Sequence, residues 1–112
     1  MTTQSHDQLP APVADYFEAA NRGETNKLTT FFAADATVRD EGHTYAGIGA
    51  ISDWVQKTAA AYQPRYRIHS IRFEPGRAVA TLEVSGTFPG SPLTLEQAFT
   101  VSGGTITRLE TL

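Results

Sequence analysis

The 112-residue sequence contains no cysteine. It can therefore form no disulfide and offers no thiol nucleophile. No stretch approaches the roughly 20 consecutive apolar residues that span a bilayer. The opening residues, MTTQSHDQLP, also lack the charged start and apolar run of a secretion signal. We therefore expect a soluble protein with no membrane contact, located in the cytoplasm.

Positive charge is scarce as well. Nine Lys and Arg face twelve Asp and Glu, which gives a formal net charge of −3, and the basic residues are scattered. This balance provides no basic surface for nucleic acid or for an anionic membrane. The three histidines, His6, His43 and His69, are too dispersed for a zinc site, so we expect no metal. No nicotinamide, flavin or phosphate-loop signature is present, so we expect no cofactor.

The length and composition are those of one ordinary domain. A content of 40% hydrophobic and 19% charged residues is typical of a globular protein, and 112 residues leave no room for a second domain. The first residues are polar, and the pattern changes at Pro10. We expect a loose tail over residues 1–9 and a single domain over residues 10–112.

The first half of the domain shows helical periodicity. Apolar residues at helical spacing begin after Pro10 and end at Gly23, and a second short helix is expected from Glu24. The stretch of residues 37–47 is expected to begin as the first strand and to lead into a loop that holds His43 and Tyr45. A third helix is expected over residues 48–62, because Pro64 ends its apolar pattern.

The pattern of the second half predicts β-strands throughout. β-branched and aromatic residues alternate with polar ones, and Gly/Pro clusters separate strands near residues 65–73, 78–88, 93–101 and 105–112. Helices followed by a meander of strands predict an α+β domain, with the helices on one face of a curved antiparallel sheet. The uncovered face favours a homodimer through the sheet. The arginines that alternate along this half fit either a solvated face or a dimer contact; they are Arg65, Arg67, Arg72 and Arg77.

Two polar side chains are expected on the apolar faces of strands. If Val38 points into the core, Asp40 points the same way, and an inward carboxylate is costly unless it is solvated, paired or used. Asp40 also fits a simpler role, capping the turn that Gly42 begins. Gln97 alternates with Leu95 and Phe99, so it is expected to face inward, either in a site or in a structural hydrogen-bond network.

The order of elements resembles the nuclear transport factor 2-like superfamily and its SnoaL-like branch. The resemblance rests on the phrases YFEAANRGETNKLTTFFAADATVRDEG and YAGIGAISDWV and extends over residues 10–112. It implies a cone-shaped fold with an internal apolar pocket. This fold hosts isomerases, cyclases and dehydratases as well as proteins without catalytic activity.

The chain also looks like the bacterial ketosteroid isomerases. The match of YFEAANRGE places Tyr16 at the family's oxyanion-hole tyrosine, and ADATVRD places Asp40 at its general base. Gln97 stands where that family has a protonated aspartate. The resemblance therefore implies Asp40, Tyr16 and Gln97 as catalytic residues, although a tyrosine on an apolar helix face is also a common core residue.

Two classes of function remain open. In the first, the domain is an isomerase, cyclase or dehydratase that moves a proton next to a carbonyl in a small hydrophobic molecule, with His43 able to assist. In the second, it is a non-catalytic ligand-binding or dimerisation module. The residues that we expect around the ligand are Phe17, Phe32, Val38, His43, Trp54, Val84, Phe88 and Phe99.

Overall fold

A computed structural model describes residues 9–112. The expected tail and His6 lie outside these residues, apart from Leu9, which is buried in the core. The elements follow in this order: α1 (Ala11–Asn21), α2 (Thr25–Leu28), η2 (Thr29–Phe31), β1 (Phe32–Asp40), β2 (His43–Ala46), α3 (Gly47–Tyr62), β3 (Arg65–Glu74), β4 (Arg77–Ser85), β5 (Leu93–Ser102) and β6 (Thr105–Thr111).

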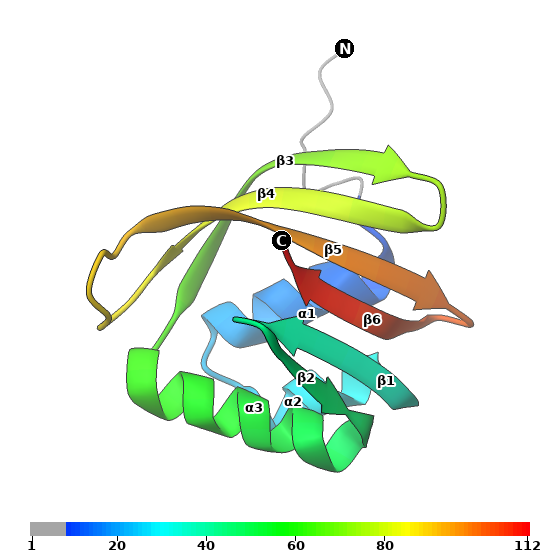
Figure 1. Ribbon diagram of the computed structural model, residues 1–112, viewed down its shortest axis with the longest axis horizontal. Coiled ribbons are helices and arrows are strands. Elements are labelled where there is room, and N and C mark those ends of the chain that lie inside the picture. The colour runs from blue at the N-terminus through cyan, green and yellow to red at the C-terminus, as the bar shows by residue number, and fades with distance from the viewer. Residues whose placement is uncertain (1–8) are drawn as a thin grey trace.

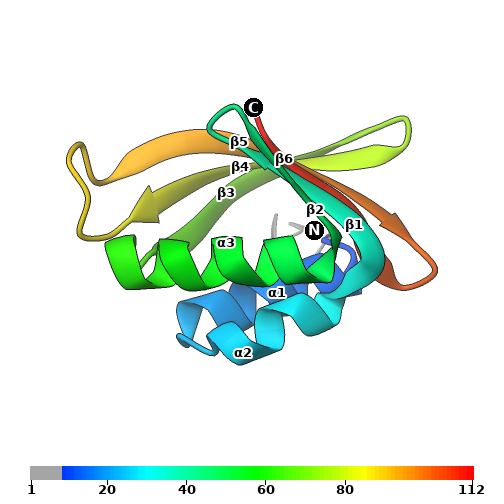
Figure 2. The same ribbon diagram turned by 60° about the horizontal axis from the view of Figure 1, so that its bottom comes forward.

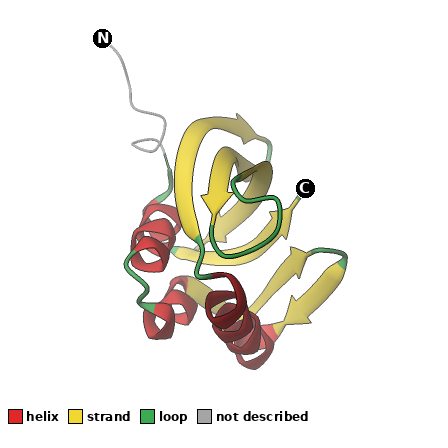
Figure 3. Cartoon of the chain, turned by 90° about the vertical axis from the view of Figure 1, so that its left-hand side faces the viewer, coloured by secondary structure: helices red, strands yellow, loops and turns green. Residues whose placement is uncertain are grey.

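The strands form one six-stranded sheet in the order β2-β1-β6-β5-β4-β3 (Figure 1). All three α-helices lie on the same face of this sheet (Figure 2), and the sheet curls strongly around that face (Figure 3). The α+β fold with helices on one face is therefore confirmed. One pairing differs from the expected antiparallel pattern, because β1 runs parallel to β6. The short turns that impose antiparallel pairing join neighbours in sequence, and no such turn links these two strands.

The sequence analysis missed β2. The residues that it assigned to a loop, His43 and Tyr45, belong to a strand that pairs antiparallel with β1. Glu41 and Gly42 form the two-residue turn, with φ of +52° and +78°. Positive φ at both positions is the geometry that matches the twist of a tight hairpin. Because β2 has only four residues and is mostly exposed, its pattern was too short to predict a strand.

Strand β4 also ends earlier than expected, at Ser85 rather than at residue 88. The chain leaves the sheet at Gly86, where a β-carbon would collide with the backbone oxygen of Tyr62. The next amide, that of Thr87, donates a hydrogen bond of 2.7 Å to the same oxygen. The loop after β4 is thereby attached to the C-terminal end of α3.

An aromatic cluster forms the centre of the core. Tyr16 of α1 packs edge-on against Phe17, Phe32 and Phe99, with ring centroids 5.3, 5.7 and 6.0 Å apart. Edge-to-face rings at these distances are favourable beyond the area that they bury. The cluster joins α1 to β1 and β5, so it holds the helices against the sheet.

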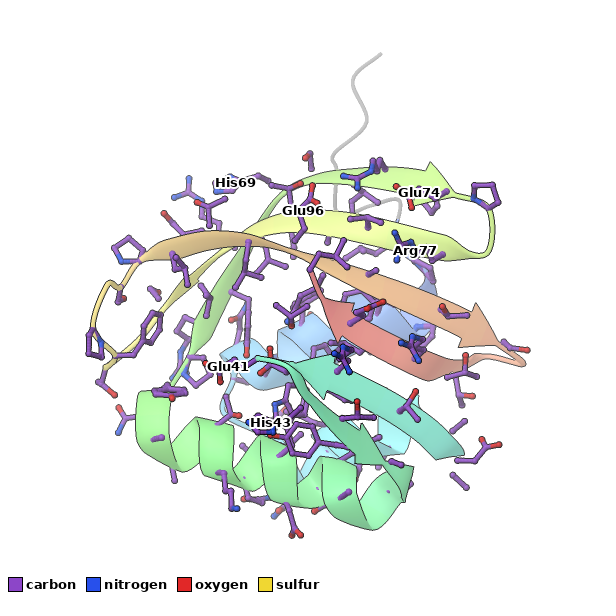
Figure 4. The ribbon with its side chains drawn as sticks, viewed as in Figure 1. Glu41, His43, His69, Glu74, Arg77 and Glu96 are labelled. Carbon is purple, nitrogen blue, oxygen red and sulfur yellow. The ribbon has the colours of Figure 1, made fainter. Side chains whose placement is uncertain are left out.

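Charged side chains cover the opposite face of the sheet. Arg72 bonds Glu96 at 2.7 Å and Glu74 at 2.9 Å, and Arg77 bonds Glu74 at 2.8 Å. Figure 4 shows Glu74 and Arg77 near the turn between β3 and β4, and Glu96 farther along the same sheet.

Among the described residues, no helix is long and apolar enough to cross a membrane.

Candidate functional site

A cleft of about 610 Å³ opens between α3, the curled strands and the turn between β1 and β2. Its walls are mainly apolar and aromatic, and its polar groups are few, which is typical of a small-molecule site. The lining residues are Asp40, Glu41, Gly42, Trp54, Thr58, Tyr62, Pro64, Tyr66, Val84, Phe88, Pro89, Leu93, Leu95, Gln97, Thr111 and Leu112.

Asp40 is half-buried at the end of β1 and lines this cleft. Val38, two residues earlier, is fully buried, so the strand alternation places the carboxylate on the helix-facing side as expected. Its Oδ2 atom accepts a hydrogen bond of 3.2 Å from the indole Nε1 of Trp54. This bond joins β1 to α3 and holds the carboxylate at the cleft. The side chain of Asp40 therefore bonds the helix and does not cap the backbone of the turn.

Gln97 lies on β5 and is the one polar residue among the buried residues of the described chain, with 6% of its surface exposed. Its Nε2 donates a hydrogen bond of 3.2 Å to the hydroxyl of Thr111, which lies opposite it on β6. Its Oε1 has no partner among the described residues. Both residues line the cleft, but the unpaired amide oxygen itself is buried behind the cleft surface.

Tyr16 lies deeper, in the wall of a second cavity of about 230 Å³ between the helices and β3. It is 2% exposed, and burial raises its pKa well above the usual value, with smaller contributions from Tyr66 and Asp40. The phenol therefore stays protonated throughout the physiological range and can serve as a hydrogen-bond donor.

Tyr66 is a site residue that the sequence analysis missed. It lines both cavities, together with Trp54, Thr58 and Pro64. Burial, followed by the negative charge of Asp40, raises its pKa to about 12. A signal for its position was present, because Tyr66 alternates with Ile68 on the apolar side of β3, but alternation alone does not distinguish a cleft wall from the core.

The residues expected around a ligand divide into three groups. Trp54, Val84 and Phe88 line the cleft. Four others are buried in the core and are not among the lining residues: Phe17, Phe32, Val38 and Phe99. His43 is exposed on β2 next to α3 and is also not part of the lining (Figure 4).

The mouth of the cleft is formed by the end of α3 and the loop after β4. Tyr62 and Phe88 meet edge-on with ring centroids 5.6 Å apart, and the hydroxyl of Thr87 donates to the backbone oxygen of Ala61 at 3.2 Å. These contacts fix the loop in place, so the opening has a defined aromatic rim.

The charge of the cleft is negative. Asp40 and Glu41 line it, and no Lys, Arg or His occurs among its lining residues in the described chain. Residues 9–112 also contain no group of three His, Asp or Glu side chains arranged to hold a metal ion. The groups that the cleft offers for chemistry are therefore two carboxylates, one amide, four hydroxyl-bearing side chains and the indole of Trp54, which bonds Asp40.

Comparisons with known proteins agree on the fold. The sequence model of the SnoaL-like domain matches residues 13–110. A "putative polyketide cyclase" from Sinorhizobium meliloti is 38% identical, covers 98% of this chain and 100% of its own, and superposes with a TM-score of 0.90. No curated protein matches the chain.

Two further solved structures are similar in fold. A protein with a ketosteroid isomerase-like fold from Catenulispora acidiphila, in complex with trimethylamine, is 24% identical with a TM-score of 0.80, covering 94% of this chain and 86% of that one. The Δ5-3-ketosteroid isomerase from Mycobacterium sp. is 16% identical with a TM-score of 0.75, covering 91% and 89%.

Proposed function

Because the chain belongs to the SnoaL-like domain family of the nuclear transport factor 2-like superfamily, we propose that its cleft binds a small, mostly hydrophobic molecule, and that Asp40 removes a proton next to a carbonyl group of that molecule. The observation that carries the proposal is a carboxylate in an otherwise mainly apolar cleft that contains no basic side chain. Such a group can act as a general base once a ligand excludes water.

The proposed reaction begins with the transfer of a proton from the carbon beside the carbonyl to Asp40. The electron pair of the broken C–H bond moves to the carbonyl oxygen and gives an enolate, which hydrogen-bond donors stabilise. The proposed donors are the phenol of Tyr16 and the amide of Gln97, whose Nε2 has a second hydrogen beyond the one given to Thr111. Return of the proton to another carbon would complete an isomerisation.

Tyr66 extends this donor set. Its phenol lies in the walls of both cavities, so a ligand in the cleft can reach it without entering the smaller cavity, which Tyr16 lines. A phenol whose pKa lies near 12 gives up its proton less readily than an ordinary tyrosine. It therefore acts here as a hydrogen-bond donor to the enolate, while Asp40 holds the transferred proton.

One observation favours a non-catalytic binding module as the second candidate. The hydrogen bond from Trp54 gives the carboxylate of Asp40 a structural role that needs no reaction. In that case Asp40→Asn would leave ligand affinity and stability almost unchanged, since the amide oxygen of asparagine can still accept the indole proton.

The distinguishing experiment follows the absorbance of the conjugated enone while a β,γ-unsaturated ketosteroid is incubated with the protein. We expect Asp40→Asn to slow the reaction by about 10²-fold or more, the usual effect of losing a general base. Asp53→Asn is the matched control, because Asp53 is exposed on the far side of α3 from the lining residues. Absence of the band with every protein would contradict catalysis on this carbonyl compound and favour the binding module.

We also propose that the domain forms a homodimer through the sheet face that the helices leave open. On this face Arg72, Arg77 and Arg108 alternate with Glu74, Glu96 and Glu110 in one chain of ion pairs. Equal numbers of opposite charges allow a second copy to approach without net repulsion. Light scattering should give twice the mass of one chain, and a monomer mass at micromolar concentration would refute the dimer.

A further inference from the structure

The cleft carries negative charge that no described residue balances. Asp40 and Glu41 both line it, and neither forms an ion pair within residues 9–112. Figure 4 shows Glu41 at the turn between β1 and β2. The charge of Asp40 also acts within the wall, because after burial it is the second cause that raises the pKa of Tyr66 to about 12. A cation in the cleft would therefore meet two carboxylates whose charge is still uncompensated.

The mouth of the cleft exposes apolar surface. Four large hydrophobic side chains are exposed in the described chain, and one of them, Phe73, lies outside the cleft lining. The other three all line the cleft; they are Tyr62, Leu93 and Leu112, with 37%, 50% and 51% of their surface exposed. Exposed apolar side chains gathered at one opening are typical of a binding site.

Aromatic rings line the same cleft from α3, β3 and the loop after β4; they belong to Trp54, Tyr62, Tyr66 and Phe88. The rings of Tyr62 and Phe88 lie at an interplanar angle of 77° at the mouth. Rings at nearly right angles form adjacent walls of a box, and the electron-rich face of each ring attracts a cation. Because the indole N–H of Trp54 bonds Asp40 at 3.2 Å, aromatic and negatively charged groups meet inside the cleft.

We propose that the cleft binds a hydrophobic organic cation, a quaternary ammonium group on an apolar body, with its charge between the carboxylates and the aromatic rings. The inference deepens the proposed function by naming the class of ligand. It rests on that function only in that the cleft binds a small, mostly hydrophobic molecule, and it requires no catalysis.

The walls favour an alkylated ammonium group over a primary one. A primary ammonium is compact and strongly hydrated, so mainly apolar walls would strip its water without replacing the lost hydrogen bonds. Alkyl groups on the nitrogen contact such walls directly. A quaternary nitrogen also carries no proton that it could give to Asp40, so the carboxylate remains able to act as the base in the proposed reaction.

The same charges disfavour the alternatives. An anionic ligand would lie with Asp40 and Glu41 in a cleft whose lining contains no Lys, Arg or His within the described part of the chain. A neutral ligand would exclude water from the two carboxylates and leave both without a partner of opposite charge. Only a cation converts this desolvation into attraction.

Three ligands that share the body of benzyl alcohol measure the preference. They carry a trimethylammonium, a tert-butyl or a carboxylate group at the ring position opposite the hydroxymethyl group, and the first two have nearly the same shape. Trp54 is the only tryptophan of the chain, so its indole N–H gives a unique signal in a nitrogen-correlated NMR spectrum and reports binding in the cleft itself. We expect the ammonium compound to bind about 10-fold more tightly than the tert-butyl compound, and the carboxylate to bind most weakly.

Variants that each remove one negative charge assign the preference to the cleft. Asp40→Asn and Glu41→Gln should each lower the affinity ratio of the ammonium compound to the tert-butyl compound, and the double variant should abolish the preference. Asp53→Asn is the matched control, because Asp53 is exposed and does not line the cleft. An equal loss with Asp53→Asn would overturn the inference by assigning the preference to the net charge of the protein.

A second pair of variants tests the aromatic contribution at the mouth. Tyr62→Leu keeps an apolar side chain but removes the ring, so it should weaken binding of the ammonium compound and leave binding of the tert-butyl compound almost unchanged. Leu93→Met, in the same cleft lining, should change neither affinity. Equal losses for both ligands in Tyr62→Leu would contradict attraction between the cation and the ring.

The wild-type titrations decide the matter even if a variant fails to fold. Equal or tighter binding of the tert-butyl compound, with a shifted Trp54 signal, would overturn the preference for a cation and leave the proposed binding function intact. Tightest binding of the carboxylate would overturn it as well. A Trp54 signal that none of the three ligands moves would contradict both this inference and the proposed binding function.

Discussion

Replacement of Phe99 by alanine is expected to lower the free energy of unfolding by about 3–5 kcal/mol, the range for truncating a buried phenylalanine. Phe99 is 1% exposed, and its ring contacts Tyr16 and Phe17 with centroids 6.0 and 5.5 Å apart. Its loss would leave a cavity that the surrounding helices and strands cannot close. Since a domain of this size is stable by only about 5–15 kcal/mol, the variant should lie close to the limit of folding.

Urea denaturation followed by circular dichroism measures this effect, and Phe73→Ala is its matched control. Phe73 lies on β3 and is 58% exposed, so the same truncation there should change stability by only about 0.5 kcal/mol. Equal losses in the two variants would contradict the aromatic core. The result also matters for the site, because Phe99 lies two residues from Gln97 on the same face of β5.

Stability should fall steeply at alkaline pH. The pKa of Tyr66 is raised to about 12 in the folded protein, and that of Tyr16 is also raised well above its usual value, mainly by burial. Below about pH 10 both phenols are protonated in the folded and unfolded states, so their contribution to the free energy of unfolding is fully present. Above it the unfolded chain ionises first. Ionisation of Tyr66 in the unfolded chain should then lower the free energy of unfolding by about 2–3 kcal/mol by the time the pH reaches the folded pKa of this residue. Ionisation of Tyr16 adds to this loss.

Denaturation at a series of pH values, together with the near-ultraviolet absorbance of tyrosinate, tests this dependence. Tyr66→Phe should make the alkaline loss smaller, whereas Tyr62→Phe at the exposed rim of the cleft should leave it unchanged. Asp40→Asn should lower the pKa of Tyr66, because the charge of Asp40 is one of the two causes that raise it. A pKa of Tyr66 that this variant does not move would contradict the electrostatic coupling of these two groups.

Much of the fold could be predicted because its signals are local. The helical stripe from Val13 to Ala20, the stop at Pro64 and the alternation of the later strands each depend on residues close together in sequence. The inward direction of Asp40 and Gln97 follows in the same way, since it needs only the two-residue period of a strand. The short strand β2 was missed because four mostly exposed residues carry too little of that period.

The division between core and cleft could not be predicted. Val38 and Asp40 share one face of β1, and so do Gln97 and Phe99 on β5, yet one member of each pair packs in the core while the other lines the cleft. Whether an inward side chain meets another side chain or open space depends on the distance between the layers. That distance is set by the curl of the whole sheet and by the attachment of the loop after β4 to α3.

The sequence by itself determined the helices, the order of the longer strands, the class of fold and the side of the sheet on which Asp40 and Gln97 lie, because short-range periodicity and turn chemistry encode all of these. Only the tertiary structure decided that Trp54 bonds Asp40, that Thr111 takes one hydrogen of the Gln97 amide and leaves its oxygen unpaired, and that Tyr66 faces the cleft. Each of these two hydrogen bonds joins residues 14 positions apart, through strand register and helix packing that no local pattern specifies.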